Sequence, residues 1–405
     1  MTHRITREIL AHNEGRDPER LRLKYGHLRQ NPFAFFRGTN HLFLRQLPRS
    51  NTLFRAPGAL ICGDLHLENF GTYKGDNRLC YFDINDFDEA CLAPFTVEIV
   101  RFLTGVYLAA PEFKIKRSDA AILARSFLRG YTSAIDSGKP RWVERPSADG
   151  AIRVLLRRAM RRTRVSLLDR YTRVRGTQRS FRIDGARMFA ATDRERKSLA
   201  GFCRRLKAAG LKKSFFHLQD AARRVAGNGS LGIPRFMMLV TGRGSPNGNF
   251  LLDLKFADAS ATAGWSGLAQ PAWSGDAQRI VTLQGILQAI PPALLGAVTF
   301  EGQDFVLKEL QPLLDRLDLA GLCAKIRRLN RVVETMGAIT GWAHLRGCGQ
   351  HGAAPLAMLR AHAAGRKWQA RADALARASA LNLGKAWRHY SADYDAGRVT
   401  AGPSG

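Results

Sequence analysis

Two acidic motifs, each placed directly after a short apolar run, occupy residues 59–88. Ala59-Leu60-Ile61 precedes the motif at 62–71, and Leu79-Cys-Tyr-Phe82 precedes the motif at 83–88. Apolar runs of this length are typical of buried strands, and Lys74-Gly-Asp-Asn77 between them indicates a turn. The segment is therefore predicted to be a hairpin that carries Asp64, Asn69 and Asp83 to one edge.

Asp64, Asn69 and Asp83 are residue types that phosphoryl-transfer enzymes use as a base and a metal clamp. A carboxylate such as Asp64 can accept the proton of a substrate hydroxyl. The oxygens of Asn69 and Asp83 suit Mg²⁺, and Asp86 offers a further carboxylate. The alternative is that these residues only cap strands and turns, as Asp and Asn often do. Two linked motifs in this order favour a functional site.

A glycine-rich loop lies far downstream, at Gly227-Asn-Gly229-Ser-Leu-Gly232. The apolar run 236–240 follows it, then a Gly/Pro/Asn turn, and then a second apolar run that carries Lys255. Glycines allow backbone N–H groups to approach a phosphate, and the lysine supplies a positive charge. Because strand-like rather than helical sequence follows, the loop fits a kinase-type flap better than a dinucleotide-binding turn. The alternative for Lys255 is a lysine that protects an edge strand.

The pattern along the chain predicts an α+β protein in four parts. Residues 1–58 form an N-terminal helical extension, and 59–224 the hairpin with a helical lobe. Residues 225–312 form a small β-rich nucleotide-binding lobe, with a helix at 276–291 and strands at 295–300 and 305–310. Residues 313–405 supply C-terminal helices.

The two acidic motifs resemble those of the kinase-like fold in its aminoglycoside and choline kinase branch. That branch has H-G-D-x-H-x-x-N, which Gly63-Asp64-Leu-His66-Leu-Glu-Asn69 matches except for Cys62 at the first position. It also has I-D-x-x-D, which Asp83-Ile-Asn-Asp86 matches from its first Asp. The resemblance implies a two-lobed fold that binds ATP and Mg²⁺. Because the hairpin precedes the small lobe here, it also implies a circularly permuted order.

From about residue 20 to 365 the chain resembles a bacterial family, the domain of unknown function 2252. The segments that carry this resemblance are 31–38, 63–71, 82–89, 229–232, Leu254-Lys255, 305–312 with Asp315-Arg316, and Ala343-His344. The resemblance implies a kinase-like architecture and names no substrate. Members tend to carry a Glu in the helix after the strand lysine, whereas no acid occurs here between Arg279 and Val298. We therefore expect the acid that orients Lys255 either to be missing or to come from elsewhere, for instance Asp253 or Glu309.

The net charge of +29 is concentrated in one segment. Residues 151–225 contain 22 Lys or Arg and 5 Asp or Glu, a surplus of 17. The arginines at 153, 157, 158, 161, 162 and 164 recur at helical spacing beside an apolar stripe of Leu155, Leu156, Met160 and Val165. Such a face suits an anionic partner, whether nucleic acid, a lipid surface or a phosphorylated substrate. The alternative is a solvated face in an arginine-rich protein, since no nucleic-acid-binding motif accompanies the charge.

Other features limit the class of protein. No apolar run is long enough for a transmembrane helix, and six scattered cysteines suggest free thiols in the cytoplasm. His66 and His344 are expected to be structural, and Arg37 to pair with a site carboxylate or to pack through its stem. The function expected is an ATP- and Mg²⁺-dependent phosphotransferase acting on an unknown small-molecule or protein acceptor, for which the arginine-rich segment suggests an anion. The alternatives are a nucleotide-binding pseudokinase, an AMP-transferring enzyme, and a basic nucleic-acid- or membrane-surface-binding protein that uses the fold as a scaffold.

Overall fold

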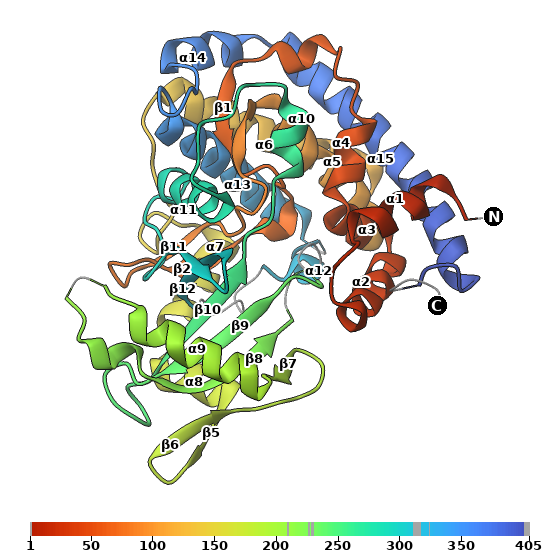
Figure 1. Ribbon diagram of the computed structural model, residues 1–405. Coiled ribbons are helices and arrows are strands. Elements are labelled where there is room, and N and C mark those ends of the chain that lie inside the picture. The colour runs from red at the N-terminus through yellow and green to blue at the C-terminus, as the bar shows by residue number, and fades with distance from the viewer. Residues whose placement is uncertain are drawn as a thin grey trace.

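The structure is a computed structural model that describes residues 2–208, 210–225, 227, 231–310, 317–323 and 325–400. Helices and strands are mixed along these ranges, which confirms the α+β class. One part of the molecule is built around a six-stranded sheet and the rest is mainly helical (Figure 1). No helix among the described residues has the length and apolar character needed to cross a membrane.

Four helices precede the hairpin and pack beside the long helix α15 (Lys367–Asp395), as Figure 1 shows in red and blue. They are α1 (Arg4–His12), α2 (Pro18–Gln30), α3 (Pro32–Gly38) and α4 (Asn40–Gln46), and the 3₁₀ turn η1 (Thr52–Arg55) follows them. Both α2 and α3 begin with a proline, and Asp17 and Asn31 cap them by accepting backbone N–H groups. These are favourable starts, because the proline lacks an N–H that would have no partner and the cap satisfies another.

The two apolar runs of the hairpin segment form β1 (Gly58–Ile61) and β3 (Cys80–Ile84), but they do not pair with each other. Instead β1 pairs with β4 (Cys91–Pro94), and β3 forms a hairpin with β2 (Phe70–Lys74), which follows the 3₁₀ turn η2 (Leu67–Asn69). The prediction of a single hairpin from the two runs is therefore wrong, although the turn after Lys74 is confirmed. Ile61 and Phe70 stand at the two ends of the first acidic loop, and they are opposite Cys91 and Ile84, which stand at the two ends of the second. The two acidic loops therefore lie side by side.

Segments from both halves of the sequence build one helical core. Its helices are α5 (Thr96–Glu112), α6 (Arg117–Ser137), α7 (Gly150–Met160), α12 (Leu319–Cys323), α13 (Ile326–Gly347) and α14 (Leu356–Ala364), together with α15. α13 packs along α6 and against β1, and α15 packs along α5. The largest hydrophobic cluster joins these helices to the first four helices and to the strands beside the acidic loops. The acidic loops are therefore anchored on this core.

The sheet has the order β11-β12-β10-β9-β8-β7, and all its pairs are antiparallel. Its strands are β7 (Met188–Ala190), β8 (Leu218–Arg224), β9 (Arg235–Val240), β10 (Phe250–Phe256), β11 (Gly296–Phe300) and β12 (Gln303–Glu309). Helices α10 (Ala261–Ser266) and α11 (Asp276–Leu287) connect β10 to β11. The predicted helix at 276–291 and the predicted strands after it are thus confirmed within a few residues.

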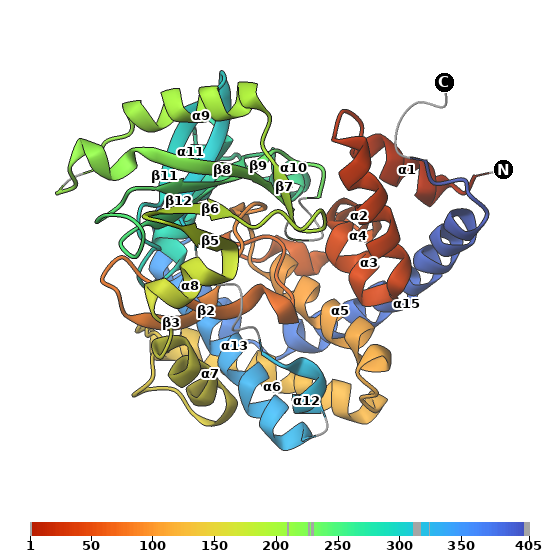
Figure 2. The same cartoon turned by 90° about the horizontal axis from the view of Figure 1, so that it is seen from below.

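The two faces of the sheet have different environments. One face is apolar and packs on Leu199 and Phe202 of α9 (Asp193–Arg205), which Figure 2 shows over the outer side of the sheet. The opposite face is apolar only at one end, where it contacts α8 (Arg164–Tyr171) and the hairpin β5 (Thr172–Arg175) and β6 (Gln178–Phe181). The other end of that face carries charged side chains that line a cavity.

The basic segment differs from its prediction. It was expected to be helical to about residue 225, but it contains four strands, β5 to β8, besides α7, α8, α9 and the 3₁₀ turn η3 (Lys213–Phe216). Arginines recur on both its helices and its strands, so they hide the alternation by which strands are recognised. Leu155 and Leu156 are buried as expected, whereas Met160 is 52% exposed because it lies in the last turn of α7.

Candidate active site

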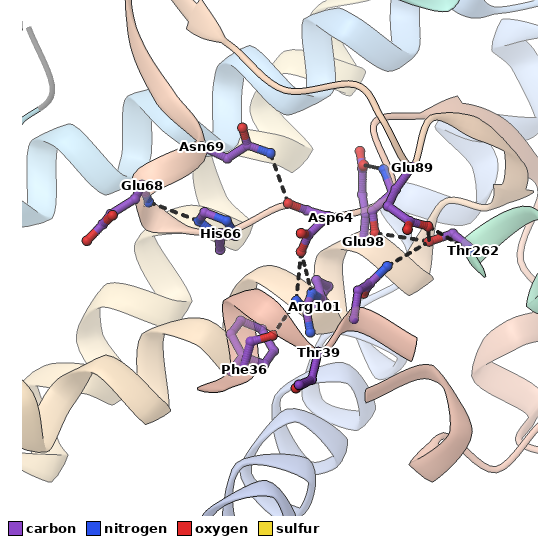
Figure 3. Close-up of polar contacts among 12 residues, drawn as sticks. Phe36, Thr39, Asp64, His66, Glu68, Asn69, Glu89, Glu98, Arg101 and Thr262 are labelled. Atoms are coloured by element: carbon purple, nitrogen blue, oxygen red, sulfur yellow. Dashed lines mark hydrogen bonds and ion pairs between the residues drawn. The ribbon is translucent and has the colours of Figure 1, made fainter. Parts of the chain in front are cut away.

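A cavity of about 210 Å³ is lined by the two acidic loops, the charged end of the sheet and the first four helices. Five of the predicted site residues line it: Asp64, Asn69, Asp86, Gly227 and Lys255. These residues come from segments separated by more than a hundred positions in the sequence, so the fold brings them together. Figure 3 shows the first acidic loop with its polar contacts.

Asp64 lies in the first loop and forms an ion pair with Arg101 of α5 (Figure 3). Oδ1 of Asp64 accepts a hydrogen bond from Nε of Arg101 at 2.8 Å, and Nη2 of Arg101 lies 2.7 Å from the same oxygen in the ion pair. The guanidinium is fully buried and lies over the ring of Phe36, with its carbon 3.6 Å from the ring centroid. Burial raises the pKa of Asp64 and Arg101 opposes this only in part, so the carboxylate is a better proton acceptor than an exposed one.

Backbone and amide contacts join the first loop to the second. Nδ2 of Asn69 donates to the carbonyl oxygen of Asp64 at 2.9 Å, and the carbonyl oxygen of Asn69 accepts from the backbone N–H of Asn85 at 3.0 Å. These bonds fix the position of the Asn69 amide beside the second acidic motif.

His66 and Arg37 hold the first loop at its other side. Nδ1 of His66 accepts the backbone N–H of Glu68 at 3.2 Å, which agrees with a structural role for this histidine. The carboxylate of Glu68 forms an ion pair with Arg37 at 2.7 Å, so of the two alternatives for Arg37 the pairing with a site carboxylate is confirmed. The first four helices are thereby tied to the loop that carries Asp64.

A buried network supports the start of the first loop, at Cys62 and Gly63. Oε2 of Glu98 in α5 accepts the backbone N–H groups of Cys62 and Gly63, at 2.8 and 3.2 Å. Oε1 of Glu98 bonds to Nε2 of His344 at 2.6 Å, and Nδ1 of that ring bonds to the hydroxyl of Tyr131 at 3.0 Å. His344 is thus a buried helix histidine, as predicted, and it orients the carboxylate that holds the loop.

Asp83 and Asp86 are three positions apart in the sequence, but Asp83 is buried in a strand and Asp86 lines the cavity. Asp83 lies in β3, is buried, accepts the backbone N–H of Ala289 at 3.3 Å and lies 3.8 Å from Arg346. It does not line the cavity, whereas Asp86 does. The expectation that Asp83 holds a metal with Asn69 stays a prediction. Asp83 shares a face of the β2–β3 hairpin with Tyr73, which lines the cavity, whereas Asp86 lies beyond the strand in the loop.

Lys255 of β10 contacts a carboxylate of the second loop, Asp88. Its side chain is only 12% exposed, which excludes the alternative of a solvated edge-strand lysine. The suggestion that Asp253 or Glu309 orients it is wrong, because Asp253 pairs with Arg235 and Arg224, and Glu309 pairs with Arg78. Burial alone would lower the pKa of Lys255, but Asp88 and Asp86 raise it above its usual value.

The charged end of the sheet adds cations that the sequence analysis missed. Arg224, Arg235 and Lys308 line the cavity beside Lys255, and the four residues come from four adjacent strands, β8, β9, β10 and β12. Lys308 is opposite Asp253 in the β10–β12 pair and so shares a face with Lys255. Burial would raise the pKa of Asp86, yet Lys255 and Lys308 lower it, so this carboxylate is ionised at neutral pH.

The glycine-rich loop lies between β8 and β9 in the sequence, and its described glycines, Gly227 and Gly232, differ in their contacts. Gly227 lines the cavity and has a φ of 82°. Gly229 lies outside the described residues. Gly232 faces the first helices instead, because a Cβ there would lie 3.0 Å from Cβ of Arg16 and 3.2 Å from Leu21. Gly232 therefore permits a close approach of the glycine-rich loop to the N-terminal segment.

The donor atoms of Asn69 and Asp86 fit Mg²⁺. Nδ2 of Asn69 is bonded to the backbone, so its amide oxygen is the atom suited to a metal, and Asp86 supplies a carboxylate held ionised by two lysines. Mg²⁺ prefers such oxygens and completes its shell with water and phosphate oxygens. Over the described ranges no three His, Cys, Asp or Glu side chains converge on one metal position, so protein ligands alone would not make a closed site.

Several residues of the site carry little signal in the sequence. Arg101 and Glu98 lie in an apolar helix far from the motifs they support, and only the placement of charges within an apolar helix points to them. Lys308 has the signal that identified Lys255, a single lysine within an apolar strand. Asp88 belongs to the second acidic motif, but its partner could not be read from its position.

Comparison with known proteins gives one match. No curated protein matches the chain, and no solved structure does. A family model described as "Uncharacterized protein conserved in bacteria (DUF2252)" matches residues 16–395, which include both acidic loops, the sheet and the helices behind them. Since this match covers nearly the whole chain, the protein belongs to that bacterial family.

Proposed function

We propose that the protein is an ATP- and Mg²⁺-dependent phosphotransferase with a two-lobed, kinase-like fold in circularly permuted order. The observation that carries the proposal is the contact between Lys255 and Asp88 inside a cavity that Asp64, Asn69 and Asp86 also line. A strand lysine, an ionised carboxylate, an amide and a separate carboxylate base are the parts that phosphoryl transfer in kinases requires.

The order of the elements supports the permutation. The acidic loops and α5 to α7 precede the sheet, and α13 to α15 follow it, yet α13 packs on α6 and β1 as part of the same core. A kinase-like chain cut before the catalytic strands would show this order. Figure 2 shows the sheet on one side of the acidic loops and the helical core on the other.

Each group has a proposed role. Lys255, Lys308 and Arg235 would bind the phosphates of ATP, and Asn69 and Asp86 would hold Mg²⁺, which supplies charge neutralisation between the phosphates. Asp64 would accept the proton of the acceptor hydroxyl. The hydroxyl oxygen forms a bond to the γ-phosphorus while the bond to the bridging oxygen breaks, and ADP leaves with that electron pair.

The ion pair of Asp64 favours one alternative, a protein that binds nucleotide without transferring phosphate. Because Arg101 occupies Oδ1 of Asp64 through two N–H groups, only Oδ2 can take a proton without breaking that pair. An AMP-transferring enzyme would use the same nucleotide groups. Analysis of the products separates these functions: ADP indicates phosphoryl transfer, pyrophosphate indicates AMP transfer, and an unchanged nucleotide indicates binding alone.

The test is calorimetric titration of the full chain with ATP in the presence and absence of Mg²⁺. We expect Lys255→Met to weaken binding by roughly 10- to 100-fold, as for loss of a charge-assisted hydrogen bond. Asp86→Asn should remove the dependence on Mg²⁺. Asp64→Asn should bind ATP normally and lower turnover by roughly 100-fold or more.

Two controls share the chemistry of these changes but lie outside the cavity. Asp136→Asn alters an exposed carboxylate of α6, and Lys385→Met removes an exposed lysine of α15. Both should bind Mg·ATP as the wild type does. The proposal would be ruled out if the wild type did not bind Mg·ATP. It would also be ruled out if Lys255→Met and Asp86→Asn bound Mg·ATP as tightly as the wild type does.

A further inference from the structure

The cavity continues past the acidic loops to a wall built by the first four helices. Six residues form this N-terminal wall: His12, Arg16, Lys24, Arg37, Asn40 and His41. None of them belongs to the hairpin or to the sheet, so the groups assigned to ATP and Mg²⁺ do not explain why polar side chains gather here.

Two polar atoms of this wall have no hydrogen-bond partner among the described residues, Oδ1 of Asn40 and Nε2 of His41. Asn40 is only 8% exposed, and its Nδ2 donates to the hydroxyl of Thr262 at 3.1 Å. That bond fixes the amide, so its oxygen is held in place as an acceptor. A buried acceptor left without a donor is costly, which makes a ligand hydroxyl a suitable partner.

The wall also concentrates positive charge. Nη1 of Arg16 and Nζ of Lys24 both donate to one neutral oxygen, Oδ1 of Asn13, at 3.2 and 2.7 Å. The carboxylate of Asp258, which pairs with Arg16 at 3.0 Å, is half-exposed. Lys24 is 1% exposed, and burial followed by Arg16 lowers its pKa well below the usual value. An anion bound here would offset the lowering of the Lys24 pKa that burial and the charge of Arg16 cause.

The N-terminal wall adjoins the residue proposed as the base. Nη2 of Arg101 donates to the carbonyl oxygen of Phe36 in α3 at 2.8 Å, while the same guanidinium holds Asp64 (Figure 3). Arg37 is paired with Glu68 of the first acidic loop. A ligand on this wall would therefore lie next to Asp64 and on elements other than the sheet that carries Lys255.

We propose that the N-terminal wall is the acceptor subsite and that it binds a small hydroxylated anion. Arg16 and Lys24 would bind its phosphate or carboxylate group, and Asn40 and His41 would bind a hydroxyl. This inference rests on the proposed function, because only a phosphotransferase needs an acceptor beside Asp64. It identifies the acceptor by chemistry, as a polyol that carries one acidic group.

The experiment measures the melting temperature of the full chain with four probes. Glucose 6-phosphate and gluconate are hydroxylated anions with different acidic groups, glucose is hydroxylated and neutral, and inorganic phosphate is an anion without a carbon-bound hydroxyl. We expect one or both hydroxylated anions to raise the melting temperature by a few degrees at concentrations about 100-fold above their Kd. Which of the two does so identifies the acidic group.

Variants locate the binding. Arg16→Gln and Lys24→Met should each weaken binding by about tenfold or more, whereas Arg22→Gln, an exposed arginine of α2, should not change it. Arg16 serves as the second site in case the Lys24 variant does not fold. Lys255→Met should keep the response to the hydroxylated anion and lose the response to Mg·ATP.

The outcomes separate this inference from the proposed function. No response to any probe, an equal response to inorganic phosphate, or a response that survives both Arg16→Gln and Lys24→Met would overturn the acceptor subsite. If Mg·ATP still stabilises the protein in that case, the proposed function stands. A response to the hydroxylated anion without any response to Mg·ATP would overturn the proposed function and retain the anion site.

Discussion

Gly63 shows how closely the two acidic loops approach each other. It precedes Asp64 and has a φ of 83°, a conformation that residues with a side chain rarely adopt. A Cβ at this position would lie 2.2 Å from the carbonyl oxygen of Glu89, in the loop that carries Asp86 and Asp88. The glycine is therefore needed for its backbone conformation and for the contact.

Gly63→Ala is expected to lower the free energy of unfolding by about 3 kcal/mol or more, because the methyl group must displace backbone atoms. Gly15→Ala is the matched control, since Gly15 has a φ of 78° and nothing within 4 Å of its Cβ position. It should lose only about 1 kcal/mol, the cost of the conformation alone. Urea unfolding of the two variants measures the difference, and equal losses would show that the loops can separate freely.

At the scale of the elements, strands with clear alternation were predictable and basic ones were not. β10 and β12 place apolar residues toward α9 and stand between turn signals, so their sequence indicates strands. β8, with the sequence Leu-Gln-Asp-Ala-Ala-Arg-Arg, has no β-branched or aromatic residue. It is a strand because it pairs with β7 and β9, which is a property of the folded sheet and not of the local sequence.

The candidate site was predictable to a similar extent. Asp64, Asn69, Asp86 and Lys255 were identified from their motifs, and the structure brings them to one cavity. Asp83 lies within β3 and does not itself line the cavity, whereas Asp86 lies in the loop beyond it, and the sequence does not show where β3 ends. Arg101 and Asp88 act through partners that lie far away along the chain, so only the folded arrangement reveals them.

The hydrogen bonds of Glu98 join α5 to α13 and to the first acidic loop, and they predict how strongly changes of Glu98 lower the free energy of unfolding. Glu98→Ala removes the acceptor of two buried N–H groups and the partner of His344, so we expect a loss of about 3–5 kcal/mol in the free energy of unfolding. Glu98→Gln keeps an acceptor of the same shape and should recover more than half of that loss. Chemical denaturation of both variants tests this, and equal stability of the two would mean that the carboxylate side chain does not hold the loop.

At the scale of the whole molecule, the lowered pKa of His41 predicts how the free energy of unfolding depends on pH. It stacks on His12, with centroids 3.7 Å apart, and burial followed by the charges of His12, Lys24 and Arg16 lowers its pKa to about 2. The unfolded chain, with a histidine pKa near 6.5, therefore binds one more proton than the folded protein between these values. Stability from this group is complete above about pH 6.5 and falls as the pH decreases, by at most about 1.4 kcal/mol per pH unit.

The measurement is the melting temperature between pH 7 and pH 5 for the wild type and for His41→Gln. Burial raises the pKa of Asp64, Asp83 and Glu89, and these groups oppose the loss in both proteins. The variant should therefore lose less stability on acidification than the wild type does. His217→Gln, which changes an exposed histidine, should follow the wild type, and identical profiles for all three proteins would contradict the assignment.

The contact between Glu98 and His344 also sets an order of events during synthesis. Residue 98 leaves the ribosome long before residue 344, so a nascent chain that already contains both acidic loops still lacks the imidazole that orients the carboxylate beneath them. We therefore expect the loop bearing Asp64 to reach its final geometry only after most of the polypeptide has been translated. A ribosome stalled before α13 would display the motifs without the arrangement that they require.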